Sequence, residues 1–171
     1  MSPRKRIAGA VLAALVIALA VVGVAVGTPP SGIKSAVVNA RGDFPDRTDV
    51  KFRFRPAHGS GLTVADARRA GEVAIQQIVI ENGGHTGWHT HPGPVVVVVK
   101  SGALTYVAAG DASCEGRTYE AGEAFVDAGQ GHVHIARNLS GEDLELWATY
   151  FDVPPGGALR IDADDPGTCP F

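Results

Sequence analysis

Several common features are missing from this chain of 171 residues, and each absence removes a class of protein. We find no P-loop, no dinucleotide-binding fingerprint and no internal repeat. A basic stripe is missing too. The formal net charge is -3, and residues 1–27 contribute only the three positive charges of Arg4, Lys5 and Arg6, so residues 28–171 carry -6. We therefore expect no nucleic-acid partner, because an acidic domain binds phosphate backbones poorly.

Cysteine is also scarce, with only Cys114 and Cys169 in the chain. An export signal would place this pair in an oxidising compartment, where two cysteines tend to be bridged. The bridge would close a long loop, tie the C-terminal tail to the domain and stabilise it by about 4 kcal/mol in the chain-entropy model. Two unrelated buried thiols are the alternative. We predict the disulfide.

The first 27 residues have the pattern of an export signal. A cationic start, Arg4-Lys5-Arg6, precedes an uncharged apolar stretch that ends at Gly27. The stretch is long enough to span a bilayer as a hydrophobic helix, with its cationic end in the cytoplasm. A cleaved signal peptide and a buried core helix are the alternatives. We expect a signal anchor in the cell membrane with the rest of the chain on the extracytoplasmic side, or a secreted protein if the segment is cleaved.

The remainder of the chain predicts an all-β fold, because its short apolar runs are separated by many of the 22 glycines and 11 prolines. We expect a linker at residues 28–45, of which 33–45 could also be a first edge strand, and one β-barrel domain at 46–171. Residues 63–71 fit either a short capped helix or a strand. The architecture predicted is a small antiparallel β-barrel or jelly roll, preceded by the N-terminal hydrophobic helix and wrapped by the tail from residue 154.

Two histidine pairs are the most informative feature of the sequence. His89 and His91 lie between a glycine-rich turn and the valine run 95–99, and alternate residues of a strand share one face. The valines indicate that this face is buried. His132 and His134 likewise lead from a glycine-rich turn into an apolar strand. A third inward imidazole, from this second strand, would complete a facial set of nitrogen ligands for a metal ion and leave positions open for water or substrate.

These stretches resemble the two motifs of the cupin superfamily. Motif 1, G-x5-H-x-H-x3/4-E-x6-G, is matched by Gly83, His89, His91 and Gly102. Motif 2, G-x5-P-x-G-x2-H-x3-N, is matched at four positions, which are Gly122, Gly131, His134 and Asn138. The sequence departs from the family where the motif 1 glutamate falls on Val95, or on Val96 with the longer spacing. It also has Gly129 in place of the motif 2 proline, and one extra residue separates Gly122 from Gly129.

The resemblance implies a cupin-like barrel that binds one divalent metal through His89, His91 and His134. Imidazole suits zinc, iron, copper and nickel, whereas manganese prefers carboxylate oxygen. The missing glutamate therefore argues against manganese, which many family members use. Three neutral ligands leave the full +2 charge on the ion, which favours an anionic small molecule or a more acidic bound water. The resemblance also implies a homodimer, because many relatives pair their barrels.

Whether the protein is an enzyme is left open by the sequence. An oxygenase-like, metal-dependent enzyme is permitted, because some cupins with three histidines are thiol dioxygenases. Such an enzyme needs a proton shuttle, for which His132 and His85 are the candidates. His132 could instead be a fourth ligand or an ordinary turn residue, and His85 an exposed turn residue. The other hypotheses are a non-enzymatic barrel that binds a small molecule or a metal, a structural dimerising module, and a degenerate cupin without metal.

Overall fold

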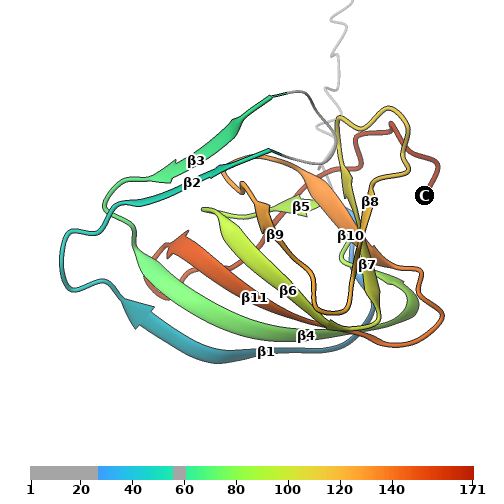
Figure 1. Ribbon diagram of the computed structural model, residues 1–171, viewed down its shortest axis with the longest axis horizontal. Coiled ribbons are helices and arrows are strands. Elements are labelled where there is room, and N and C mark those ends of the chain that lie inside the picture. The colour runs from blue at the N-terminus through green and yellow to red at the C-terminus, as the bar shows by residue number, and fades with distance from the viewer. Residues whose placement is uncertain (1–26, 56–60) are drawn as a thin grey trace, which may run out of the picture.

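The computed structural model describes residues 27–55 and 61–171, and all the regular elements within these ranges are β-strands (Figure 1). The all-β prediction is confirmed, while the hydrophobic helix predicted for the N-terminal segment lies outside the described residues except for Gly27. Within the described part of the chain there is no apolar helix of membrane-spanning length. The strands are β1 (Ser31–Asp43), β2 (Val50–Phe54), β3 (Thr63–Ala67), β4 (Glu72–His85), β5 (His89–Thr90), β6 (Val95–Ser101), β7 (Ala103–Ala108), β8 (Arg117–Glu120), β9 (Ala124–Asp127), β10 (His134–Asn138), β11 (Leu144–Val153) and β12 (Ile161–Asp162).

Ten of these strands form one antiparallel sheet that curls into a nearly closed barrel (Figure 1). The strand order is β12-β5-β10-β4-β11-β6-β9, while β1 pairs with β4, and β7 joins β10 to β8. The long strands β4 and β11 lie together from the pair Leu144–Ile80 to the pair Val153–Glu72. This topology places β5 and β10, the two strands that begin with histidine, side by side.

The valine run forms the inner wall of the barrel. Along β6, Val95, Val97 and Val99 are buried, whereas Val98 is exposed, as strand alternation requires. The buried residues of β11, which are Leu144, Leu146, Ala148, Tyr150 and Val153, pack with these valines into the main core. The prediction that the valines mark a buried strand next to the histidines is therefore confirmed.

Strand β1 occupies most of residues 28–45, for which the sequence predicts a linker. The edge strand left open as an alternative for residues 33–45 is what the structure has, because β1 pairs with β4 over nearly its whole length. Ile33 packs against the main core, and Arg41 forms an ion pair with Glu72 at the other end. Contacts with distant strands, rather than the pattern of β1 itself, hold this strand in place.

Strands β2 and β3 form a separate two-stranded sheet that lies across one end of the barrel (Figure 1). The ambiguous segment at residues 63–71 is therefore a strand followed by a turn. Ala65 and Ala67 are buried and alternate with more exposed residues. Phe52 of β2 contacts Phe151 of the barrel, with ring centroids 5.3 Å apart.

The C-terminal tail wraps the barrel, as expected. Its strand β12 pairs with β5, and Ala163 donates a backbone hydrogen bond to Trp88. The predicted disulfide between Cys114 and Cys169 is present, and it joins the tail to the loop that follows β7. Cys169 also belongs to a second buried cluster with Trp88, Val107 and Ile135.

Candidate metal centre

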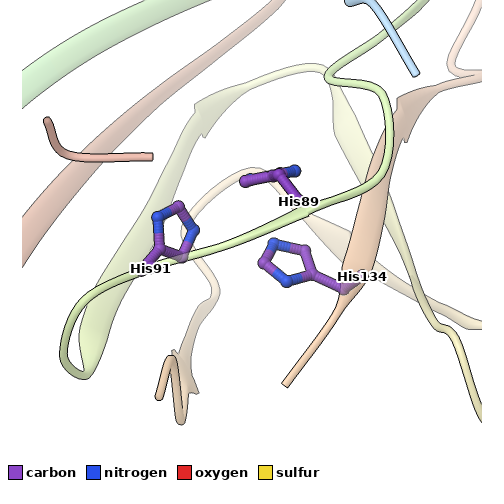
Figure 2. Close-up of side chains that lie close together, drawn as sticks. All are labelled: His89, His91 and His134. Carbon is purple, nitrogen blue, oxygen red and sulfur yellow. The ribbon is translucent and has the colours of Figure 1, made fainter. Parts of the chain in front are cut away.

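Three histidines from two distant segments meet inside the barrel (Figure 2). His89 begins β5, His91 follows it, and His134 begins β10, where it is the direct cross-strand partner of His89. The ring centroids of His89 and His134 are 4.3 Å apart, and those of His89 and His91 are 4.8 Å apart. The sequence prediction that these three side chains share one space is what the geometry shows.

The three rings are buried, with residue exposures of 4% for His89, 6% for His91 and 4% for His134. One potential ligand atom from each lies within 4.8 Å of the others. Two nitrogens bound to one ion at about 2.1 Å lie about 3.4 Å apart in a tetrahedral site. The widest pair would therefore have to approach by about 1.4 Å for the set to close around a single cation.

Backbone carbonyls fix the orientation of the rings. Nδ1 of His89 donates to the carbonyl of Gly87 at 2.9 Å, and Nδ1 of His91 donates to the carbonyl of Leu159 at 2.8 Å. Nδ1 of His134 makes a longer contact of 3.4 Å with the carbonyl of His132. Because a carbonyl can only accept, these nitrogens carry the protons, and each Nε2 keeps the lone pair that binds a metal.

Burial keeps these imidazoles neutral. It lowers the pKa of His89 to about 2, with the neighbouring His134 and His91 lowering it further. Burial also holds the pKa of His134 well below its ordinary value, and lowers the pKa of His91 although Asp127 opposes that shift. The neutral form is the one that coordinates metals, so the donor set fits a divalent ion.

The structure adds Asp127, a residue that fills no defining position of either motif and that the sequence does not mark as a metal ligand. It ends β9 and is 3% exposed, and its Oδ2 atom is buried without a hydrogen-bond partner among the described residues. This oxygen lies 3.5 Å from Nε2 of His91 and 3.1 Å from Nδ1 of His134. The only signal in the sequence is an acid directly before the glycine-rich turn of motif 2, which alone does not distinguish a buried acid from a solvated one.

The two candidate proton shuttles do not join the cluster. His132 is exposed in the turn, where its Nδ1 contacts the carbonyl of Gly129 at 2.8 Å. His85 ends β4 and accepts a hydrogen bond from the backbone N–H of Gly87, so it braces the turn before His89. A ligand role for His132 finds no geometric support, and a catalytic role for either residue stays a prediction.

Two further residues of the motif stretches lie away from the three histidines. Trp88 points away from the histidines, is fully buried and stacks on Phe171 with ring centroids 6.4 Å apart. Asn138 is fully buried, and its amide nitrogen donates to the carbonyl of Ile80 in β4 and to the carbonyl of Glu142 in the turn after β10. Both residues support the fold and contribute nothing to the metal centre.

A cavity of about 930 Å³ lies beside the centre, between the end of the β2–β3 hairpin and the wall formed by β7, β8 and β9. Tyr106 separates it from the cluster, because this residue lines the cavity while its ring stacks on His134 at 4.6 Å. The lining is mostly apolar, with Arg55, Arg117 and His132 among its polar residues. The cavity is large enough for a small organic molecule.

No protein-family model and no curated protein matches the sequence. Solved structures that match include a cupin-2 domain protein from Shewanella frigidimarina, 22% identical, with 45% of this chain and 68% of that chain covered at a TM-score of 0.37. A cupin-like protein from Thermotoga maritima is 20% identical, with 54% and 65% covered at a TM-score of 0.45. Oxalate decarboxylase from Bacillus subtilis, a protein with Mn(II) centres, is 21% identical, with 53% and 23% covered at a TM-score of 0.42.

This chain thus spans less than two thirds of the Thermotoga protein and about a quarter of the decarboxylase. The nearly closed antiparallel barrel, and the placement of His89, His91 and His134 on neighbouring inner positions, agree with the fold and ligand set expected from the two histidine motifs. The preference for zinc, iron, copper or nickel over manganese stays unconfirmed. Manganese is not excluded, because the argument against it assumed a site without carboxylate, and Asp127 borders the cluster.

Proposed function

We propose that this chain is a metal-binding cupin whose barrel holds one divalent ion through the Nε2 atoms of His89, His91 and His134. The observation that supports this most is the state of the three rings. All are buried and neutral, and their Nδ1 atoms are turned toward backbone carbonyls. Burying three imidazoles in this way costs free energy, which a bound cation would offset.

We further propose that a small anionic molecule binds beside the ion. The cavity next to Tyr106 supports this, because its apolar lining suits an organic body while Arg55 and Arg117 suit a negative group. The ion itself would add positive charge and, when bound, would act as a Lewis acid. His132 lines the same cavity and is the better placed of the two proton-shuttle candidates. This arrangement is compatible with an oxygenase-like enzyme and equally with a non-enzymatic binding protein.

Two observations support the remaining parts of the proposal. The Cys114–Cys169 disulfide suits an oxidising compartment, in agreement with a barrel held outside the cell membrane by the N-terminal segment, or secreted after its cleavage. Cell fractionation with a protease-protection assay tests this location.

Val37 and Val38 are 52% and 46% exposed on the edge strand β1, which favours a homodimer through that edge. Analytical ultracentrifugation of Val38→Lys beside the wild type tests the dimer.

Elemental analysis tests the metal proposal directly. The full-length protein, loaded with a divalent metal and then desalted, should retain about one ion per chain, and the variant with His89, His91 and His134 all replaced by alanine should retain none. His85→Ala and His132→Ala are matched controls, because both remove an imidazole from the same stretches and should leave the metal content unchanged. Equal metal content in the wild type and the triple variant would contradict the proposal.

A further inference from the structure

The position of the missing acidic group is given by the strand pairing. With the shorter of the two motif 1 spacings the glutamate falls on Val95, the first residue of β6, and β6 pairs with β9 so that the direct partner of Val95 is Asp127. Side chains of directly paired residues have Cβ atoms about 5 Å apart and project from the same face of a sheet. A carboxylate on Asp127 therefore enters the space that a glutamate at position 95 would reach, but from the neighbouring strand.

The contacts of Asp127 leave one oxygen available. Its Oδ1 atom accepts a hydrogen bond of 2.9 Å from the backbone N–H of Gly129, which fixes the carboxylate against the turn. Its Oδ2 atom is buried and makes no hydrogen bond among the described residues, and it faces Nδ1 of His134 at 3.1 Å and Nε2 of His91 at 3.5 Å. A carboxylate oxygen that is removed from water without a partner is costly, and a cation in the cluster would satisfy it.

The separation between Asp127 and His91 suits a shared ion, whereas the 3.1 Å contact with His134 is to Nδ1, which is not the proposed ligand atom. Oδ2 of Asp127 is 3.5 Å from Nε2 of His91. Two donors at about 2.1 Å from one metal lie about 3.4 Å apart in a tetrahedral site and about 3.0 Å apart at right angles in an octahedral one. The observed distance is therefore close to that between two ligand atoms of one ion, before any rearrangement of either side chain.

We propose that Asp127 is the fourth protein ligand of this metal centre, and that it takes the place of the glutamate absent at position 95. This inference rests on the proposed metal binding by His89, His91 and His134. A site of three imidazoles and one carboxylate carries a net charge of +1 instead of +2 with a divalent ion. It accepts harder metals than three imidazoles alone, so Mn²⁺ joins Fe²⁺ and Zn²⁺ among the ions that it can hold.

Cobalt substitution tests the proposal, because the visible absorption of Co²⁺ reports its ligands. We expect Asp127→Asn, which keeps the shape of the side chain, to weaken Co²⁺ binding at least tenfold and to change the absorption spectrum. Asp49→Asn is the matched control: Asp49 also accepts a backbone N–H bond, from Arg69, but lies at the start of the β2–β3 hairpin. This control should bind Co²⁺ with the wild-type affinity and spectrum.

The outcomes separate this inference from the proposed function. If the wild-type protein binds no Co²⁺, the metal-binding function itself is wrong. If it binds Co²⁺ and Asp127→Asn has the same spectrum, Asp127 is not a ligand, even where affinity falls because the residue only orients His134. If Asp127→Asn does not fold, a crystal structure of the cobalt-loaded wild type decides. An Oδ2–Co²⁺ distance of about 2.0–2.3 Å supports the proposal, and one beyond about 3 Å overturns it.

Discussion

The chemical state of single side chains decides what the centre can do. The three imidazoles are buried and lie close to one another, with ring centroids of neighbouring pairs 4.3 and 4.8 Å apart. A positive charge on any one of them would therefore be shielded from water and would repel a charge on its neighbours. Backbone carbonyls then select the tautomer, with the proton on Nδ1. Asp127 and the ring of Tyr106 complete the immediate surroundings of His134.

At this scale we predict that the metal-free protein loses stability in mild acid. Unfolded histidines bind protons near pH 6.5, whereas folded His89 does so only near pH 2, and His91 and His134 are shifted in the same direction. Below pH 6.5 the unfolded state therefore binds more protons, and the free energy of unfolding falls by up to about 1.4 kcal/mol per pH unit for each histidine. Burial raises the pKa of Asp127 from its ordinary value of 3.8, so above pH 3.8 the folded state binds this proton more readily than the unfolded state. The Asp127 carboxyl therefore offsets part of the fall in unfolding free energy that the histidines cause.

Urea denaturation with a chelator between pH 7.5 and 4.5 measures this slope. The variant with all three histidines replaced by alanine is the comparison, because it lacks the groups responsible and should show a much flatter profile. Parallel profiles for the two proteins would mean that the imidazoles do not stay neutral on folding.

Among the elements, the turn between β9 and β10 has the largest influence on the site. It carries Asp127 at one end and His134 at the other, and the backbone N–H of Gln130 bonds to the carbonyl of His91. Gly129 makes this approach possible: it has a φ of +58°, and a Cβ there would lie 1.9 Å from the carbonyl oxygen of Gly93. Only glycine fits this position without moving the two histidine segments apart.

We predict that Gly129→Ala disrupts both stability and metal binding. The added methyl group must push the turn away from Gly93, which should cost more than about 2 kcal/mol of unfolding free energy and displace Asp127 and His134. Gly131→Ala is the matched control, because Gly131 has a φ of +90° in the same turn but nothing within 4 Å of an added Cβ. It should show backbone strain alone, of about 1–2 kcal/mol, with metal binding retained. Thermal unfolding and metal titration of both variants measure the difference, and equal losses would place the cost in φ alone.

Over the whole molecule, the C-terminal tail connects the disulfide to the histidine cluster. The carbonyl of Leu159 orients His91, and Asp162 in β12 pairs with His89. The same tail ends at Cys169, whose bond to Cys114 anchors it against the barrel. The disulfide thus supports the histidines from outside the barrel as well as stabilising the fold.

We predict that the Cys114→Ala/Cys169→Ala variant loses about 4 kcal/mol of unfolding free energy, the chain-entropy value for a sequence separation of 55 residues. Metal affinity should fall with it, because Leu159 is then held less firmly behind His91. Urea denaturation and metal titration measure the two effects. Ser113→Ala, a substitution of the exposed residue before Cys114, is the control for local disturbance of the loop. Unchanged metal affinity in the double cysteine variant would show that the tail stays in place without the disulfide.

Much of this protein could be read from the sequence because the relevant signals are local. Strand alternation placed His89 and His91 on one buried face, the resemblance of the second pair to cupin motif 2 indicated His134, and two cysteines allowed a single intramolecular disulfide. The features that the sequence left open depend on residues distant from each other. The edge strand β1 exists through its pairing with β4, and the carbonyl behind His91 comes from the tail. Asp127 gains its importance only because β9 lies beside β6 opposite Val95. Register and burial are set by which strands meet, and a local pattern of side chains does not contain that information.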